Sequence, residues 1–79
     1  MRVNVKLYAT LRHFAPGAAI GRPFEMNLAE GACVADLIRQ LSLPAGEVKM
    51  VYVNARAQLE DWRLKAGDEI GIFPPVGGG

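Results

Sequence analysis

Residues 2–8 read RVNVKLY and alternate strictly between polar and apolar side chains. Successive side chains of a β-strand point to opposite faces of its sheet, so this alternation is typical of a strand with one buried face. Val3, Val5 and Leu7 are predicted to face a core, while the polar residues between them face solvent. We therefore predict a half-buried strand over Arg2–Tyr8.

Further strands are predicted downstream of this segment. Phe24–Leu28 alternates in the same way and is expected to pair with the first strand as a hairpin. Met50–Val53 is rich in β-branched and aromatic residues, which pleated surfaces favour. Asn54, a residue type that tolerates positive φ, begins a turn towards a short strand near Ala57–Leu59. Glu69–Phe73 alternates again and is predicted to be the final strand.

An amphipathic helix is predicted between the second and third strands. Its apolar side chains follow the i, i+3, i+4, i+7 spacing of a helical stripe, at Val34, Leu37, Ile38 and Leu41. Pro44 is expected to stop the helix, and Asp36 suits the positive end of the helix dipole. Cys33 occupies the N-cap, where a thiol is a poorer acceptor than a hydroxyl, a shortfall of about 1 kcal/mol. Strands arranged around one helix predict an α+β fold, with the helix on one face of a mixed sheet.

Length and composition narrow the class of protein. The 79 residues suffice for one domain, and 51% hydrophobic with 22% charged residues is typical of globular chains. A net charge of +1 gives no electrostatic footprint for nucleic acid. The sequence has no membrane-length apolar run and no leader-like segment, and a lone Cys33 fits a reducing compartment. We therefore expect a soluble cytoplasmic protein that binds neither nucleic acid nor a membrane.

The sequence contains few residues of the types that catalyse reactions or bind metals. His13 and Cys33 are the sole histidine and cysteine, so a Cys/His dyad is arithmetically possible, but no third residue is suggested to orient it. A tetrahedral metal site needs several such ligands. Asp68 and Glu69 are interpreted as solvated turn residues, and Trp62 as a cover for the edge of the core. We expect no metal, no bound cofactor and no catalytic residue of the chain's own.

Two prolines are expected to end the last strand. Pro74 and Pro75 have no N–H to donate to a sheet. Residues 1–73 are therefore predicted to form a single domain, followed by a flexible tail over residues 74–79. At roughly 3.3 Å per residue, this tail extends up to about 20 Å from the domain.

Three of the nine glycines stand together in that tail, as Gly77, Gly78 and Gly79. Glycines carry no side chains that block a narrow channel, so the tail can thread into another protein and present the Gly79 carboxylate there. A frayed terminus is the alternative. A terminal carboxylate, with a pKa of about 3.5, is ionised at pH 7 and resists nucleophiles until it is activated, for example by adenylation with ATP. The acyl-adenylate then accepts sulfur or an amine, and neither step needs a catalytic group from this chain.

Sequence patterns stand out at several places along the chain: Leu7–Arg12, Gly31–Leu37, Val53–Asn54, Gly67–Glu69 and Phe73–Gly79. Together they resemble the ubiquitin-like sulfur carriers of the MoaD and ThiS family. The resemblance extends over nearly the whole chain and is most specific at the ending FPPVGGG. It implies a β-grasp fold of four to five strands, with the first and last strands parallel at the centre of the sheet and the helix across one face.

The resemblance also implies a function that depends on Gly79. A ubiquitin-activating-like adenylyltransferase of the MoeB or ThiF type would adenylate this carboxylate with ATP, and a desulfurase or rhodanese would supply the sulfur of a C-terminal thiocarboxylate. An acceptor such as the MoaE-type large subunit of molybdopterin synthase would take that sulfur. The ending resembles MoaD and favours molybdopterin synthesis, for a molybdenum or tungsten enzyme. The short connection between Leu41 and Val48 is closer to ThiS and thiamine synthesis. Another sulfur pathway, a protein modifier and an interaction module are further alternatives.

Residues next to the tail are the candidate partner-binding residues. Phe73, Pro74, Pro75 and Val76 offer rigid apolar contacts. Arg12 stands at the Leu-Arg position of the family and is expected to pair with a carboxylate of the acceptor. Half-burial against the core is the alternative for Phe73, and a solvated surface charge is the alternative for Arg12.

Overall fold

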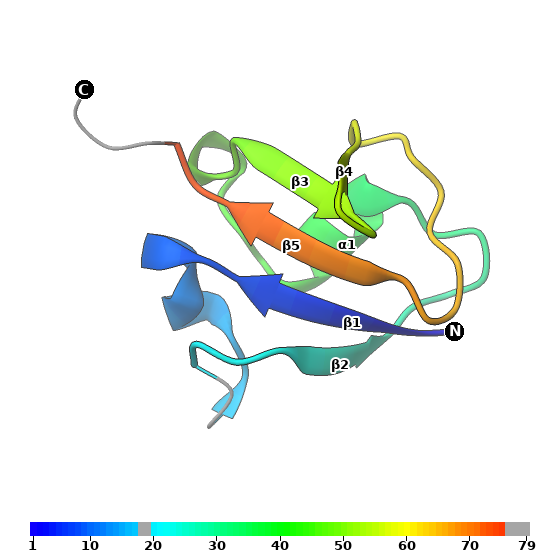
Figure 1. The fold of residues 1–79 in the computed structure, drawn as a ribbon, viewed down its shortest axis with the longest axis horizontal. Helices are drawn as coiled ribbons and strands as arrows, with labels where there is room; N and C mark the ends of the chain where they lie inside the picture. The colour runs from blue at the N-terminus through cyan, green and yellow to red at the C-terminus, as the bar shows by residue number, and fades with distance from the viewer. Residues whose placement is uncertain (18–19, 76–79) are drawn as a thin grey trace.

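Figure 1 shows the fold in a computed structural model, which describes residues 1–17 and 20–75. These residues form a five-stranded mixed sheet with the strand order β2-β1-β5-β3-β4, and helix α1 lies across one of its faces. The strands are β1 (Arg2–Leu7), β2 (Phe24–Asn27), β3 (Met50–Val53), β4 (Arg56–Ala57) and β5 (Glu69–Phe73). The helical segments are α1 (Val34–Gln40) and the 3₁₀ turns η1 (Ala9–Phe14) and η3 (Ala45–Glu47). The α+β fold expected from the sequence is confirmed.

The centre of the sheet is the parallel pair β1 and β5. Val5 lies opposite Ile70 in this pair, and Leu7 lies opposite Ile72. The strands β2 and β3 flank the pair, each antiparallel to its neighbour. The hairpin predicted for the first two strands and the parallel pair implied by the resemblance are both confirmed. Because parallel strands run in one direction, β1 and β5 end at the same edge of the sheet, where η1 begins and Pro74 follows (Figure 1).

The core lies between α1 and the sheet. The strand residues predicted to face inwards do so, and Val3, Val5 and Ile72 are fully buried. Val34 and Leu37 of α1 are fully buried against them, so the predicted helical stripe is also confirmed. Each such aliphatic side chain contributes about 1.5–3 kcal/mol when it leaves water, which makes this layer the main source of stability.

Asp36, in the first turn of α1, bonds back to Cys33 at the N-cap in the manner of a capping box. The Asp36 carboxylate accepts hydrogen bonds from the Cys33 N–H at 2.9 Å and from the Cys33 thiol at 3.4 Å, and it also pairs with Arg39. The backbone bond from Cys33, followed by the bond from Arg39, lowers the pKa of Asp36 to about 2. These bonds offset the weak cap that the sequence predicts for a cysteine.

The end of α1 also differs from the prediction. Ser42 adopts a positive φ of 58°, and the Leu43 N–H bonds back to the Ile38 carbonyl at 3.2 Å. This is the hydrogen-bond pattern of a Schellman motif, which terminates a helix at a left-handed residue. The helix therefore ends at Gln40 through this local turn, before the chain reaches Pro44.

The turn residue Asp68 is buried, so its interpretation as a solvated residue is wrong. Its carboxylate accepts hydrogen bonds from the Asn54 side-chain amide at 2.9 Å and from the Lys65 N–H at 2.8 Å. The Asn54 side-chain oxygen in turn accepts the Glu69 N–H at 3.0 Å. Glu69 itself is exposed, as predicted. Asp68 thus ties the β3–β4 turn to the start of β5.

The strand β4 begins earlier and is shorter than predicted, because the turn before it is tight. Asn54 and Ala55 both have positive φ, at 52° and 70°, and Val53 lies opposite Arg56. Such a two-residue loop matches the twist of the strands that it joins. The strand therefore starts at Arg56, directly after the turn.

The loop after β4 carries two exposed apolar side chains. Leu59 is 79% exposed and Trp62 is 45% exposed. In the described part of the chain, Trp62 is not among the half-buried side chains that pack against the core. The expectation that Trp62 covers the edge of the core therefore stays a prediction, for a side chain that keeps 45% of its surface exposed.

Candidate functional site

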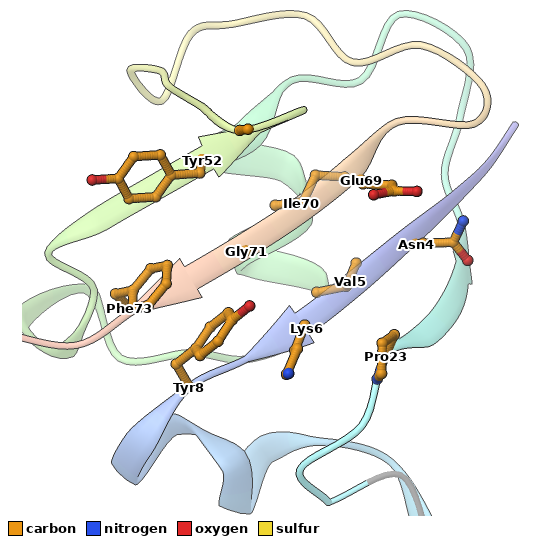
Figure 2. A pocket seen from close by; sticks show the side chains of 11 residues that line it. Asn4, Val5, Lys6, Tyr8, Pro23, Tyr52, Glu69, Ile70, Gly71 and Phe73 are labelled. Atoms are coloured by element: carbon orange, nitrogen blue, oxygen red, sulfur yellow. The ribbon is translucent and has the colours of Figure 1, made fainter.

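The face of the sheet that α1 leaves uncovered is the candidate site. A hollow of about 560 Å³ extends over β1, β5 and β3 on this face (Figure 2). Aromatic and polar side chains line it, among them Tyr8, Tyr52, Phe73, Asn4, Lys6 and Glu69. We call this surface the open face.

Aromatic rings meet at the end of the open face where β5 ends. The rings of Tyr8 and Phe73 are stacked, with centroids 4.0 Å apart and an angle of 11° between their planes. Tyr52 meets Phe73 edge-on, at 5.5 Å and 83°. Phe73 is half-buried in this cluster and does not belong to the core on the other face. Of the two alternatives considered for Phe73, packing against the core is therefore wrong.

Gly71 makes room for this stack. It lies opposite Lys6 of β1 and Tyr52 of β3. A Cβ at this position would lie 3.2 Å from Cε2 of Tyr8 and 3.6 Å from Cε1 of Phe73, and the first distance is shorter than ordinary van der Waals contact. The site residues predicted from the sequence include neither Gly71 nor Tyr8. The parallel register of β1 and β5 is the signal that brings Tyr8 beside Phe73 and both rings over the glycine.

The C-terminal segment leaves the sheet from a fixed point. The Phe73 carbonyl accepts a hydrogen bond from the Lys49 N–H at 2.8 Å. Pro74, which follows, is half-buried, and Pro75 is exposed. Both prolines lack an N–H and have φ fixed near −65°, so β5 cannot continue past Phe73.

The remaining predicted tail residues, Val76, Gly77, Gly78 and Gly79, lie outside the described residues. Arg12 lies on η1, which follows β1 at the edge of the sheet where β5 ends. Its side chain is exposed, and its Nε donates to the Ala9 carbonyl at 3.0 Å. The structure thus brings Arg12 and the start of the tail to one edge.

The residues considered for catalysis do not come together. His13 is exposed on η1, whereas the Cys33 thiol donates to Asp36 at the start of α1. No hydrogen bond joins His13 to Cys33 in the part of the chain that the structure describes. Among residues 1–17 and 20–75, no three His, Cys, Asp or Glu side chains are grouped as metal ligands. The same ranges contain no helix that is long and apolar enough to cross a membrane.

The topology defines the class of protein. The first and last strands form a central parallel pair, antiparallel strands lie outside it and a helix crosses one face, as in the ubiquitin-like β-grasp fold. The sequence matches the ThiS family model over residues 5–79. The chain therefore belongs to the ThiS family, and it has the ubiquitin-like fold of the ThiS and MoaD sulfur carriers.

Several solved structures are similar to the chain. SAMP1 (small archaeal modifier protein 1) from Haloferax volcanii is 26% identical with a TM-score of 0.76, and the match covers 100% of both chains. A putative molybdopterin converting factor, subunit 1, from Pyrococcus furiosus is 33% identical with a TM-score of 0.73, over 95% of this chain and 98% of that one. A chain from the complex of subunits 1 and 2 of the molybdopterin-converting factor from Helicobacter pylori shares the fold, at 22% identity, a TM-score of 0.62 and 100% coverage of both chains. Comparison with curated proteins finds no match.

Proposed function

We propose that this chain is a sulfur carrier whose Gly79 carboxylate is adenylated and converted to a thiocarboxylate, which donates sulfur in molybdopterin synthesis. The geometry at the end of β5 carries the proposal. A central strand ends at Phe73, two prolines follow directly, and an aromatic surface lies beside them. This arrangement offers a partner a docking surface next to the start of the tail. The ThiS family match, which extends to residue 79, supports the proposal.

The proposed chemistry takes place on the carboxylate of Gly79. One of its oxygens attacks the α-phosphorus of ATP, the bond from that phosphorus to the bridging oxygen breaks, and pyrophosphate leaves. A sulfur nucleophile, hydrosulfide in the simplest case, then attacks the carbonyl carbon of the acyl-adenylate, and AMP leaves. ATP and the catalytic groups belong to the activating partner. This chain acts as a protein substrate.

The proposed partners are an adenylyltransferase of the MoeB or ThiF type, a desulfurase or rhodanese as sulfur donor, and a sulfur acceptor of the MoaE type. Phe73, Pro74 and Pro75, together with Val76, provide apolar contact at the start of the tail. Arg12 is exposed at the same edge and is available to a carboxylate of the partner. The relative from Pyrococcus furiosus is a putative subunit 1, which supports an acceptor that is a second subunit.

The mass of the intact chain tests this proposal. Incubation with a ThiF/MoeB-type adenylyltransferase from the same organism, ATP and sulfide is expected to add about 16 Da, the difference between a sulfur and an oxygen atom. Deletion of Gly79 should abolish the gain. Leu59→Ala, a change of an exposed side chain in the loop after β4, should leave the gain intact. No gain in the full chain, or a gain that survives deletion of Gly79, contradicts the proposal.

The acceptor distinguishes molybdopterin synthesis from thiamine thiazole synthesis or another sulfur pathway. The relative from Pyrococcus furiosus favours the molybdopterin route, whereas the ThiS family match is equally compatible with the thiamine route. The thiocarboxylated chain can be mixed either with a MoaE-type subunit and the cyclic pyranopterin precursor or with a thiazole-forming enzyme. The mixture in which the chain loses about 16 Da identifies the route. Loss with the thiazole-forming enzyme alone contradicts the molybdopterin assignment.

A protein modifier is the second candidate, favoured by the likeness to SAMP1 over the whole chain. In that case the acyl-adenylate is passed to an enzyme thiol and then to a lysine amine, which forms an isopeptide bond. Lys65 is the last lysine or arginine of the sequence, so trypsin would leave residues 66–79 on the modified lysine. Detection of this remnant on other proteins supports the modifier, and its absence alongside the thiocarboxylate supports the carrier.

A further inference from the structure

The ring of Tyr8 is held between two neighbours on the open face. It stacks on Phe73 at 4.0 Å, and Nζ of Lys6 lies over it at 5.0 Å from the ring centroid. Figure 2 shows Tyr8 between Phe73 and Lys6, just beyond the end of β1. Stacking and cation–π attraction thus act on the same ring, and both favour its place beside the last residue of β5.

The main chain beside this stack is fixed as well. The Tyr8 N–H donates to the Ile72 carbonyl at 3.1 Å, and the Lys49 N–H donates to the Phe73 carbonyl at 2.8 Å. The ring of Phe73 is therefore held by Tyr8 and its carbonyl by the Lys49 N–H. Because Phe73 is the last residue before the prolines, its orientation sets the direction in which the next residues leave the sheet.

The two prolines restrict the backbone that follows Phe73, so the chain keeps the direction in which it leaves the sheet. A residue that precedes proline is confined to extended conformations, and proline fixes its own φ. Both restrictions apply to the segment Phe73–Pro75, which we call the stem. Extended prolines advance about 3.1 Å per residue. A rotation at Phe73 therefore swings the whole stem and displaces whatever is attached to it.

We propose that Tyr8 is a positioning residue, whose stack on Phe73 sets the direction of the stem and hence the rate at which the Gly79 carboxylate reacts in a docked partner. The inference rests on the proposed function. A carboxylate that enters an active site reacts from a narrow range of positions. Loss of the stack widens the range of stem directions, so a smaller share of docked complexes is ready to react. This lowers kcat, whereas loss of direct contact with a partner, which Tyr8 and Tyr52 share on the open face, acts on KM.

Kinetics of ATP–pyrophosphate exchange with the ThiF/MoeB-type adenylyltransferase, measured over a range of carrier concentrations, separate these two quantities. Tyr8→Leu keeps an apolar side chain but removes the stacked ring, and its kcat should fall about tenfold, with KM rising no more than in Tyr52→Leu. Tyr8→Phe keeps the ring and should restore kcat. Tyr52→Leu removes the matching tyrosine from the same face, and it should raise KM while kcat stays near wild type.

Amide hydrogen exchange tests the stack without any partner. The Lys49 N–H reports on the carbonyl of Phe73, and the Asn54 N–H, bonded to the Glu69 carbonyl at 2.8 Å, reports on the other end of β5. Tyr8→Leu should speed exchange at Lys49 more than at Asn54. Equal acceleration at both amides would contradict a local role of the stack.

A second variant guards against misfolding of Tyr8→Leu. Gly71→Ala keeps both rings but brings a methyl group within 3.2 Å of Tyr8. It should lower kcat and raise Lys49 exchange to a smaller extent, and wild-type values for both contradict the proposal. An unchanged kcat in folded Tyr8→Leu, or equal effects in Tyr8→Leu and Tyr52→Leu, would overturn the role of Tyr8 and leave the carrier function standing. No pyrophosphate exchange with the wild-type chain would overturn the carrier function and the role of Tyr8 together.

Discussion

The two faces of the sheet are built from the same strands but have different surfaces. Towards α1, β5 presents Ile70 and Ile72, which are 2% and 0% exposed. On the open face it presents Gly71 and Phe73, and β3 adds Tyr52, which is 36% exposed. The alternation of side chains along a strand thus separates an aliphatic face that is covered from an aromatic face that is left for contact.

The difference shows where stability and recognition are located. An aliphatic side chain gains about 1.5–3 kcal/mol when it is fully buried, so the covered face supplies most of the stability. Rings that stay partly exposed gain less on folding, and the rest of their apolar area is available to another protein surface. Substitutions on the two faces should therefore affect different quantities.

Ile72→Ala should have the largest effect on stability. Ile72 is fully buried under α1, and truncation at such a site costs about 2–5 kcal/mol. Phe73→Ala changes the next residue along the strand but on the open face, so it should cost only about 1–2 kcal/mol. Urea denaturation followed by circular dichroism measures both values. Equal losses would contradict the division of stability between the two faces.

The stack of Tyr8 on Phe73 should give a smaller, measurable coupling. In a double-mutant cycle of Tyr8→Leu and Phe73→Leu, we expect a coupling free energy of about 0.5–1.5 kcal/mol. The matched pair is Tyr8→Leu with Tyr52→Leu: each of these rings contacts Phe73, and coupling through this shared partner should be smaller than the direct coupling. Equal coupling in the two cycles would mean that the open face is a loose apolar layer, without a specific stack.

Asp36 should add a pH-dependent contribution on the covered side. Its pKa of about 2 lies below the ordinary value of 3.8, because the Cys33 N–H and then Arg39 favour the charged carboxylate. A folded-state pKa below the unfolded one stabilises the fold above the unfolded pKa, and this gain is lost as pH falls towards the folded pKa. Asp36→Asn should therefore reduce stability most above pH 3.8, with the difference from wild type shrinking between 3.8 and about 2. Thermal unfolding of both chains across this pH range measures the difference, and a constant difference would contradict the assignment.

Features that arise within one element could be predicted from the sequence. The bounds predicted for β5 match the structure, those predicted for β1 differ by one residue, and α1 begins at the first residue of the predicted stripe, Val34. Alternation and helical spacing are local patterns, and burial on one face is enough to select them. The family resemblance rests on local motifs in the same way, and the family match confirms it.

Features that depend on distant residues could not be predicted. The buried Asp68 carboxylate accepts a hydrogen bond from Asn54, in the turn between β3 and β4, and nothing beside Asp68 in the sequence signals this bond. The stack of Tyr8 on Phe73 requires the register of two strands from opposite ends of the chain. The end of α1 is set by Ser42 in the left-handed conformation. The sequence indicated Pro44 instead.

Leu59→Ser should have the smallest effect, and it tests whether exposure alone makes a docking surface. Leu59 is 79% exposed, compared with 36% for Tyr52, so its replacement should change stability by less than about 0.5 kcal/mol. It lies in the loop after β4 and does not line the hollow of the open face. If a partner docks on the open face, KM for adenylation stays at the wild-type value in Leu59→Ser and rises in Tyr52→Leu. An equal rise in both variants would mean that the partner covers the loop as well, so recognition could no longer be assigned to the open face.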